Sequence, residues 1–523
     1  MFPIYALLAF APNSVFADGS TGWHLVSGQY IIDNFRVPHH DLISYTFPQK
    51  AWVPYEWLFD AVAAALVRLG DLRLLAVVTA ASIGWLLLSI YGDVRRTGCH
   101  YLIAIGVVLI GALTSSVHWL ARPHLFTFFG VYIFARFLEA FHRNTLSPRR
   151  AIAIFGLTMI VWSNAHPGFL TGFVMVTIYL ASEVVTMIAL PPGEERRLTR
   201  KRAGTLLASL AVMAAASLLT PNGLALYPYI GSYLSPGSSA LMNAFEEFMS
   251  PTFHGEVHAG SLELLFFAIV IGLATSRRKP WLGQLLLVLA FAHLSLSGMR
   301  NEPLFAIVSV PFIAELFADN NLFALIGGPG TFSPRWLDPL RQRVRGMAQR
   351  FDAMESRCTM HLIPIVTTGI LALSCIGAGM TPAVHSLVSS QFDPKTKPTT
   401  TLDYIQNKHL AWDRGFNLDN WGGYIRYKTG QRVFIDDRLD FYGPGFYLRY
   451  VQTISIQPGW SKLLDEYKIE WVLLRKDVLL ATMLAQTPGW HLSAEDQAAY
   501  LFVRGPIAQH SLPHGVASAR SNP

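Results

Sequence analysis

Asp18 combines a carboxylate group with a position from which it could act as a general base. It follows an apolar stretch, residues 2–17, and precedes Gly19, which lets other backbone approach closely. A carboxylate in such a place can take the proton of an attacking hydroxyl group. It could equally cap a short helix over residues 21–33, and the sequence favours neither interpretation.

Two arginines are candidates for binding an anion. The loops 119–123 and 299–302 each contain one, Arg122 and Arg300, although alternate loops of the chain are otherwise almost free of Lys and Arg. An isolated guanidinium group in such a loop indicates an anionic partner, and a phosphate group fits its planar fork of donors. The alternative is an internal ion pair with a glutamate, which could be Glu246, Glu247 or Glu302.

Further polar residues could line a substrate cavity with these three. The candidates are His24, Asp41, Glu56, His124, Asn164, His166, Glu247, Asp436 and Arg438. Asp41 and Glu56 are secondary acid candidates that could bind the acceptor or a divalent cation. His124 and His166 could ligate a metal, but no histidine pair has the spacing of a metal site, which favours structural hydrogen bonds. The metal therefore stays unknown, no cofactor is certain, and a divalent cation is left open.

A run of charged residues near the end of the chain follows a short apolar segment. Val433-Phe434-Ile435 is typical of a strand, and Trp421-Gly422-Gly423-Tyr424 precedes it. Because side chains alternate along a strand, the adjacent Asp436 and Asp437 would face opposite sides, and at most one would share a site with Arg438. Carboxylates at strand ends often line ligand sites, but they also terminate strands, and both interpretations stay open.

The elements that must position these residues are membrane helices. Hydrophobic residues make up 52% of the 523 residues and charged residues 14%, whereas an ordinary soluble protein has about 25% charged residues. Aromatic residues, at 12%, exclude a disordered chain, and a total of three cysteines excludes a disulfide-stapled module. The composition therefore predicts a polytopic α-helical membrane protein.

Windows of about 17–25 apolar residues are long enough to cross a bilayer. Candidates lie near residues 72–91, 101–118, 124–141, 151–163, 168–190, 203–219, 261–275, 281–298, 303–319 and 361–380. An eleventh, 2–17, is short and ends in small residues that could instead mark signal cleavage, but it lacks a basic start. We therefore expect about 11 transmembrane helices with an uncleaved first one.

Lys and Arg gather in alternate loops, and this pattern orients a membrane protein. The stretches 95–96, 196–202 and 335–357 are rich in basic residues, whereas the loops that alternate with them are not. We therefore expect a cytoplasmic N-terminus, with Asp18 and everything after about residue 381 on the external side. The net charge of +7 then reflects orientation in the membrane and gives no evidence for nucleic acid as a partner.

The pattern divides the chain into a transmembrane module, residues 1–390, and a soluble α/β domain, residues 402–510, on the external side. Residues 391–401 form the linker, and residues 511–523 are expected to fray. In the module we expect a first external loop, 18–71, with interfacial helices that include 57–69, an external loop, 220–260, and a cytoplasmic amphipathic segment, 335–357. The basic residues of that segment are equally consistent with a plain orientation signal. In the domain we expect helices over 461–467 and 478–485 and strands over 471–474 and 500–503.

Several motifs together resemble the integral-membrane glycosyltransferases of the GT-C superfamily. Those of the first loop are Asp18-Gly-Ser-Thr-Gly-Trp-His-Leu25, Asp41-Leu-Ile-Ser-Tyr-Thr46 and Glu56-Trp-Leu58. Those that follow are Arg122-Pro-His-Leu-Phe-Thr127, Trp162-Ser-Asn-Ala-His166, Arg300, Asn420-Trp-Gly-Gly-Tyr424 and Phe434-Ile-Asp-Asp-Arg438. The likeness runs over most of the chain and is to a bacterial branch related to protein mannosyltransferases and oligosaccharyltransferases.

The resemblance implies a GT-C-like membrane module in the bacterial inner membrane. It implies transfer of a sugar from a polyprenyl-phosphate-linked donor, with Asp18 at the catalytic position and an unknown glycan, lipid or protein as acceptor. We expect Asp18 to deprotonate the acceptor hydroxyl group while Arg122 or Arg300 holds the lipid phosphate, in an outward-facing cavity. The acidic pair of protein mannosyltransferases is missing, because Gly19 follows Asp18. Two other classes fit the composition: a non-catalytic component that binds a glycan or lipid carrier, and a solute or lipid transporter.

Overall fold

The computed structural model of the chain describes residues 8–233, 246–318, 362–376 and 388–505, together with scattered positions between residues 339 and 353. Three expected features fall mostly outside these residues. They are the start of the apolar stretch 2–17, the amphipathic segment 335–357 and the tail 511–523.

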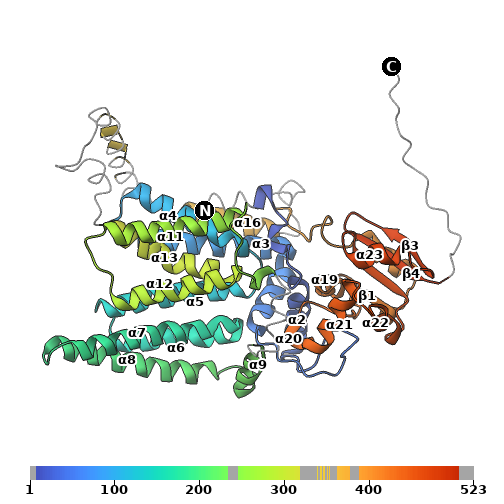
Figure 1. Ribbon diagram of the computed structural model, residues 1–523, viewed down its shortest axis with the longest axis horizontal. Helices are drawn as coiled ribbons and strands as arrows, with labels where there is room; N and C mark the ends of the chain where they lie inside the picture. The colour runs from blue at the N-terminus through green and yellow to red at the C-terminus, as the bar shows by residue number, and fades with distance from the viewer. Residues whose placement is uncertain are drawn as a thin grey trace.

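Long helices lie side by side in a bundle that fills one half of the molecule (Figure 1). In the described part of the chain they are α3 (Trp57–Arg96), α4 (Tyr101–Ser115), α5 (His124–His142), α6 (Pro148–Ala165), α7 (Leu170–Ala189), α8 (Glu194–Ser217), α11 (Val257–Thr275), α12 (Leu282–Ser297), α13 (Glu302–Ala318) and α16 (Leu362–Ile376). Each overlaps one of the apolar windows predicted from the sequence. Six helices of the described part are long and apolar enough to cross a membrane, and α12 and α16 are apolar but shorter. A total of about 11 spans stays a prediction.

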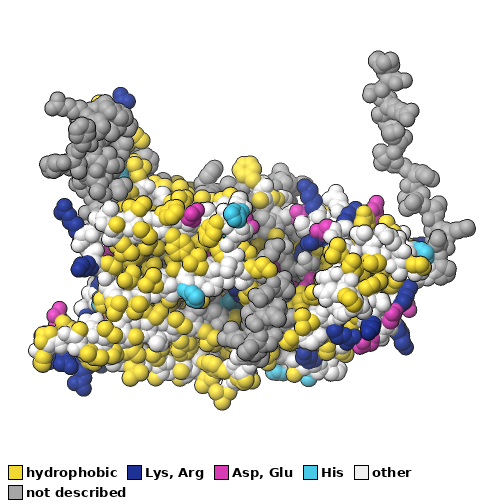
Figure 2. Space-filling model, in the orientation of Figure 1, with side chains coloured by type: hydrophobic (Ala, Val, Ile, Leu, Met, Phe, Trp, Pro, Cys, Tyr) yellow, Lys and Arg dark blue, Asp and Glu magenta, His cyan; other side chains and the backbone are white. Residues whose placement is uncertain are grey.

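Helix α4 illustrates why these segments suit a lipid environment. Leu102, Leu109 and Leu113 on its outer face are between 44% and 49% exposed, so apolar side chains point away from the bundle. On its inner face Gly111 lets α13 approach closely, because a Cβ atom there would lie 2.5 Å from Cγ2 of Val310. Hydrophobic side chains accordingly cover the visible face of the bundle, as Figure 2 shows. An outer surface of this kind is expected where the surroundings are lipid.

The segment that leads into the bundle contains two helical pieces before the first long span. Helix α2 (Thr21–Asn34) packs against the first part of α3. Helix α3 is interrupted at Gly70 and at Asp71, where φ is 52°. The carboxylate of Asp71 accepts a hydrogen bond of 2.8 Å from the backbone N–H of Arg73, which stabilises the break. Residues 57–69 are therefore a separate helical piece, as expected, and their place on the outer membrane surface stays a prediction.

Short helices occupy the turns at the end of the bundle where α2 lies. The described ones are η1 (Ser14–Phe16), η2 (Ser116–His118), η3 (Pro167–Phe169), η4 (Gly223–Ala225), α9 (Leu226–Tyr233), η5 (Glu246–Phe248) and η6 (Met299–Asn301). Tight turns of this kind bring polar loop residues from distant parts of the sequence close together.

Residues 388–505, here called the C-terminal unit, form a compact α/β body beside the bundle (Figure 1). Its elements are α18 (Thr400–Asn407), η8 (Trp412–Arg414), β1 (Gly415–Asn417), α19 (Asp419–Thr429), α20 (Leu439–Tyr442), α21 (Pro444–Ile454), α22 (Ser461–Glu466), β2 (Trp471–Arg475), α23 (Leu479–Leu484), β3 (Trp490–Glu495) and β4 (Ala499–Arg504). The sheet has the strand order β1-β2-β4-β3, in which β1 is parallel to β2 and the other pairs are antiparallel.

The predictions of α22, β2, α23 and β4 are confirmed, but the predicted strand over Val433-Phe434-Ile435 is wrong. The side-chain amide of Asn417 takes the place of a neighbouring strand: it accepts a hydrogen bond from the Phe434 N–H at 2.9 Å and donates one to the Ile435 carbonyl at 2.9 Å. These apolar residues are buried without joining the sheet. Trp421 to Tyr424 do not precede a strand either, because they lie within α19.

The C-terminal unit packs directly against the first loop of the chain. Helix α19 crosses α2 so closely that a Cβ atom on Gly22 would lie 2.4 Å from the carbonyl group of Gly423. Backbone hydrogen bonds join the two parts: the Val433 N–H donates to the Ile43 carbonyl at 3.0 Å, and the Tyr45 N–H donates to the Val433 carbonyl at 2.9 Å. The two ends of the described chain therefore meet at one end of the bundle.

Candidate functional site

Asp18 lies in the turn between η1 and α2, where the C-terminal unit contacts the bundle. Its Oδ2 atom accepts a hydrogen bond of 2.7 Å from the backbone N–H of Ser20, and another from the Ser20 hydroxyl group. Its Oδ1 atom lies 3.2 Å from Nη1 of Arg122. One oxygen therefore stabilises the turn that leads into α2, and the other faces a cation.

The surroundings of Asp18 keep its carboxyl group ionised. Burial by itself raises the pKa, but the guanidinium group of Arg122, the hydrogen bonds from Ser20 and the charge of Lys397 outweigh it and hold the pKa of Asp18 well below its usual value. The side chain is still 18% exposed, so a ligand can reach it. The ionised form is the one that accepts a proton, which is what a general base requires.

Arg122 and Arg300, from turns far apart in the sequence, meet at Glu247. Nη1 of Arg122 lies 3.0 Å from Oε2 of Glu247, and Nη1 of Arg300 lies 3.7 Å from Oε1 of the same group. The guanidinium group of Arg300 also lies 4.4 Å from the ring centre of Phe248. The two arginines hold the pKa of Glu247 below its usual value against the effect of burial. The ion-pair alternative weighed from the sequence therefore describes part of this arrangement.

Glu302, another glutamate weighed as a partner, is placed differently. Oε2 of Glu302 lies 2.9 Å from Nδ1 of His258, so its partner is a histidine. The side chains of Arg122, Glu247 and Arg300 are 22%, 25% and 29% exposed, which leaves them accessible to an anion. A phosphate group that binds here would compete with the carboxylate of Glu247 for the same donors.

A second group of polar residues is centred on Glu56, in addition to the group of Asp18, Arg122, Glu247 and Arg300. Its carboxyl oxygens lie 3.9 Å from Nε2 of His24 and 3.7 Å from Nε2 of His166. Nδ1 of His24 lies 2.6 Å from the buried carboxyl group of Asp60. Burial first, and the nearby charge of Asp60 second, raise the pKa of Glu56 well above its usual value. The charge of Arg122 opposes this rise in the pKa of Glu56, so an arginine of the first group acts on the second as well.

The hydrogen bonds of His166 fix which of its nitrogens carries a proton. Nδ1 accepts a hydrogen bond of 3.0 Å from the backbone N–H of Gly168 and lies 2.8 Å from the hydroxyl group of Thr127. Burial first, and the positive charge of Arg300 second, hold the pKa of His166 well below its usual value, so the ring is neutral. Its proton is therefore on Nε2, directed toward Glu56.

Two of the cavity candidates have structural partners instead. Nε2 of His124 lies 2.8 Å from the backbone carbonyl of His118. Asn164 accepts a hydrogen bond from the indole N–H of Trp57 at 2.8 Å and donates one to the Leu219 carbonyl at 2.9 Å. These contacts join neighbouring helices, which is the structural interpretation that the sequence favoured for the histidine.

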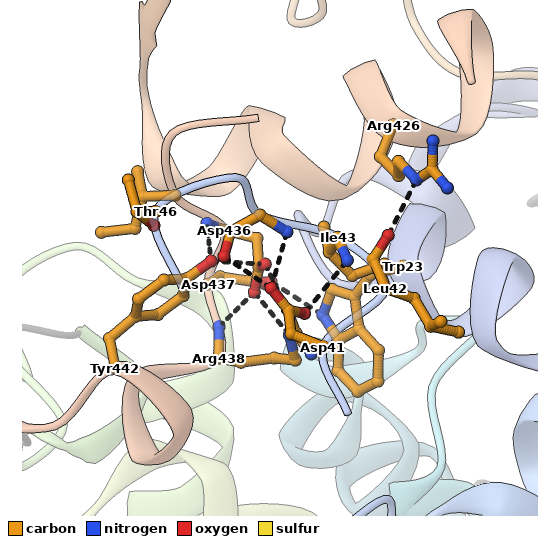
Figure 3. Close-up of polar contacts among 12 residues, drawn as sticks. Trp23, Asp41, Leu42, Ile43, Thr46, Arg426, Asp436, Asp437, Arg438 and Tyr442 are labelled. Atoms are coloured by element: carbon orange, nitrogen blue, oxygen red, sulfur yellow. Dashed lines mark hydrogen bonds and ion pairs between the residues drawn. The ribbon is translucent and has the colours of Figure 1, made fainter. Parts of the chain in front are cut away.

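Asp41, Asp436 and Arg438 form a separate buried cluster between the first loop and the C-terminal unit (Figure 3). Nη2 of Arg438 lies 2.7 Å from both Asp41 and Asp436, and Nε of Arg438 donates a further bond of 2.8 Å to Asp436. The hydroxyl group of Tyr442 donates to Asp436 at 2.8 Å. The carboxylates are fully buried, so this cluster, here called the arginine clamp, joins two parts of the chain and does not line a cavity with Asp18.

Sequence reasoning missed two residues beside Asp18. Asp437 accepts a hydrogen bond of 2.8 Å from the indole N–H of Trp23, and Figure 3 draws both residues next to the arginine clamp. Lys397 is buried and donates hydrogen bonds of 3.2 Å to the backbone carbonyls of Asp18 and Asn420. Lys397 was expected in a linker and Asp437 at the end of a strand, so the sequence held no signal that either would reach Asp18.

No group of three or more His, Cys, Asp or Glu side chains in the described ranges is arranged to hold a metal ion.

No family model matches this sequence, and no curated protein matches it. Among solved structures, the oligosaccharyltransferase of Archaeoglobus fulgidus, in its apo form, aligns over 90% of this chain and 68% of its own, with 14% identity and a TM-score of 0.51. ArnT of Cupriavidus metallidurans, in the apo state, aligns over 93% of this chain and 94% of its own, with 14% identity and a TM-score of 0.48. The same enzyme bound to undecaprenyl phosphate aligns over 97% and 98%, with 13% identity and a TM-score of 0.46.

The likeness to the oligosaccharyltransferase structure is a likeness of fold. It confirms the predicted fold class, a polytopic helical membrane protein of GT-C-like architecture with a C-terminal α/β body. At 14% identity it shows no more than the fold.

Proposed function

We propose that this protein is a membrane glycosyltransferase. It would move a sugar from a polyprenyl-phosphate-linked donor to an acceptor hydroxyl group, with Asp18 as the general base. The class of reaction and of donor comes from the resemblance of the sequence motifs, and the GT-C-like fold is consistent with both. The sugar and the acceptor are open.

The observation that carries the proposal is the arrangement around Arg122. This guanidinium group lies between the ionised carboxylate of Asp18, at 3.2 Å, and Glu247, at 3.0 Å, and Glu247 also lies near Arg300. A base for the acceptor and two cations for a phosphate leaving group are thus close together. The three turns that supply these residues are far apart in the sequence, so local structure alone does not explain why they meet.

The same residues suggest how a lipid phosphate would be held. Its oxygens would replace Glu247 as acceptors for Arg122 and Arg300, and the apolar surface of neighbouring helices would contact the polyprenyl chain. As the bond from the sugar to the phosphate breaks, negative charge grows on the phosphate oxygens, where both guanidinium groups stabilise it.

Placement in the membrane follows from the distribution of basic residues. We infer that the Asp18 end of the bundle and the C-terminal unit lie on the periplasmic side of a bacterial inner membrane, with the N-terminus in the cytoplasm. Acceptor and donor would then meet at the outer surface.

Substitution of Asp18 tests the proposal. Purified protein in liposomes is given short-chain polyprenyl phosphate carrying a radiolabelled hexose, with envelope extract as the acceptor, and labelled product is counted. Asp18→Asn should lower the transfer rate by at least about 100-fold, because the amide cannot accept the proton.

The matched control is Asp33→Asn, which removes the charge of an aspartate on α2 that is 49% exposed and paired with Arg68. It should leave transfer unchanged. Transfer retained by Asp18→Asn would refute the role of the base. Tight binding of polyprenyl phosphate without transfer, by a folded wild-type protein over a full panel of sugars, would support the non-catalytic carrier-binding class instead.

A further inference from the structure

We propose that Asp437 is a second catalytic acid, supplied by the C-terminal unit to complete a pair with Asp18. The inference rests on the proposed function and deepens it. It assigns to the C-terminal unit a chemical part in the reaction, in addition to packing against the bundle.

The position of Asp437 makes up for the missing neighbour of Asp18. Gly19 follows Asp18, and a Cβ atom built on Gly19 would lie 3.0 Å from Oδ2 of Asp437. The carboxyl group of Asp437 therefore occupies the space that a side chain at position 19 would need. The sequence has no acidic residue next to Asp18, but folding brings the carboxyl group of Asp437 to that place.

Hydrogen bonding leaves one oxygen of Asp437 directed at the site. Oδ1 accepts the indole N–H of Trp23 at 2.8 Å, which fixes the orientation of the carboxyl group. Oδ2 is the atom near Gly19, the residue that follows Asp18. The ring of Trp23 also lies 3.6 Å from that of His24 between ring centres, so Trp23 contacts both Asp437 and the histidine near Glu56.

Charges around the pair give the two acids different protonation states. The groups that act on Asp437 are Asp18, Asp436, Asp419, Arg122 and Lys397. Burial, then the negative charges of Asp18 and Asp436, raise the pKa of Asp437 well above its usual value. Arg122 and Lys397 hold the pKa of Asp18 low. Adjacent acids whose pKa values are driven apart are suited to serve as a base and a proton donor.

The chemistry balances over one turnover. Asp18 takes the proton of the acceptor hydroxyl group as the acceptor oxygen bonds to the anomeric carbon of the sugar. The bond from that carbon to the phosphate oxygen breaks, and its electron pair stays on the oxygen. Asp437 gives its proton to that oxygen, and Asp18 then passes the acceptor proton to Asp437. The pair returns to its starting state, and the products are the glycoside and protonated polyprenyl phosphate.

A structural role for Asp437 predicts a different result from Asp437→Asn. The amide oxygen can still accept the Trp23 hydrogen bond, and the amide is neutral, like the protonated acid, but it cannot give up a proton. If Asp437 only anchors Trp23, the variant should transfer sugar normally. If Asp437 donates a proton, kcat should fall by about 100-fold with little change in KM.

The pH dependence separates the two acids. In the wild-type protein, transfer should decline at high pH as Asp437 loses its proton, and Asp437→Asn should lose that decline because its residual rate needs no acid. The matched control is Asp403→Asn, an exposed aspartate on α18 of the same unit, which should keep the wild-type profile. A wild-type rate and profile in Asp437→Asn would overturn the proposal.

Infrared spectroscopy tests the pair without any substrate. The carbonyl stretch of a protonated carboxyl group is resolved from carboxylate bands, so the difference between wild type and Asp437→Asn isolates Asp437 at neutral pH. Because the charge of Asp18 raises the pKa of Asp437, Asp18→Asn should move the loss of this band to lower pH.

These readouts separate the further inference from the proposed function. If the band is present and shifts in Asp18→Asn, but wild-type protein transfers no sugar, the pair exists and the proposed reaction is wrong. If wild-type protein transfers sugar and the band is absent at neutral pH or does not shift, the inference about Asp437 is wrong and the proposed function stands.

Discussion

The arginine clamp gives the sharpest test of how the C-terminal unit is held, through the substitution Arg438→Met. Methionine keeps most of the length and apolar contact of arginine and removes its charge. Nη2 of Arg438 lies 2.7 Å from both Asp41 and Asp436, and all three side chains are at most 3% exposed. The variant therefore leaves two carboxylates in a buried place without their cation.

The expected cost can be worked out from that burial. Removing one partner of a buried ion pair costs about 3–5 kcal/mol, because the remaining charge is uncompensated. The guanidinium group also lies 4.6 Å from the ring centre of Trp52 and 4.7 Å from that of Phe441, and these cation–π interactions are lost with its charge. Since about 1.4 kcal/mol corresponds to a factor of ten, opening of the contact should become about 100 to several thousand times more frequent.

Hydrogen exchange at two backbone amides measures this opening directly. The Val433 and Tyr45 N–H groups form the hydrogen bonds between the C-terminal unit and the first loop. In detergent micelles, mass spectrometry should find their exchange accelerated by the same factor in Arg438→Met, while the core of the bundle is unchanged. The control is Arg449→Met, whose partner Glu466 is 54% exposed and whose pair should contribute at most about 1 kcal/mol.

Lowering the pH should have opposite effects in the two proteins. In wild type, burial raises the pKa of Asp41, but the charge of Arg438 and the hydrogen bonds to the carboxylate outweigh it and hold the pKa below its ordinary value of 3.8. The stability that this gives is complete above pH 3.8 and is lost as the pH falls through the lower pKa of the folded state. In Arg438→Met the unpaired carboxyl group is instead relieved by protonation, so acidification should slow exchange, after correction for the intrinsic rate. The reasoning is refuted if exchange in Arg438→Met stays within about threefold of wild type, or if Asp41→Asn in that background restores no protection.

Two further substitutions test how the C-terminal unit is docked and how it is held together. Gly22→Ala should weaken the contact of α2 with α19 by about 1–3 kcal/mol, because the new Cβ atom would lie 2.4 Å from the Gly423 carbonyl group. Hydrogen exchange in α19 measures this weakening. The control is Gly92→Ala, where nothing lies within 4 Å of the new Cβ atom, and an equal effect of the two substitutions would contradict the prediction. Asp496→Ala should destabilise the C-terminal unit by about 2–4 kcal/mol, because Asp496 accepts hydrogen bonds from four backbone N–H groups and one hydroxyl group. Thermal unfolding followed by exchange in α18 checks this, and an unchanged midpoint would argue against it.

The bundle was predictable because membrane helices carry their signal locally. Each needs a long run of apolar residues, and such a run is visible without knowing its neighbours. The association of Asp18 with Arg122 was open to inference for a related reason, because both fall in turns at the same end of alternating spans. Their contact at 3.2 Å shows that two turns brought to one end of a bundle can meet.

The C-terminal unit was harder to predict because its short elements depend on distant partners. Val433-Phe434-Ile435 has the composition of a strand, yet its hydrogen bonds go to Asn417 and to the first loop. A short run of apolar residues indicates burial, but it does not indicate which groups form hydrogen bonds with the backbone. The strands that were predicted correctly, β2 and β4, pair with each other in the sheet.

Asp436, Asp437 and Arg438 connect the packing of the C-terminal unit to the proposed chemistry. Arg438 binds the first loop through Asp41, and Asp437, the preceding residue, lies against Gly19, which follows Asp18. Loosening the clamp must therefore also displace the proposed second acid. Arg438→Met should lower transfer in proportion to the fraction of molecules in which the contact is open, although Arg438 is buried away from the substrate. If transfer survives under conditions in which exchange shows the contact to be mostly open, Asp437 is not needed for the reaction, and the C-terminal unit contributes only packing.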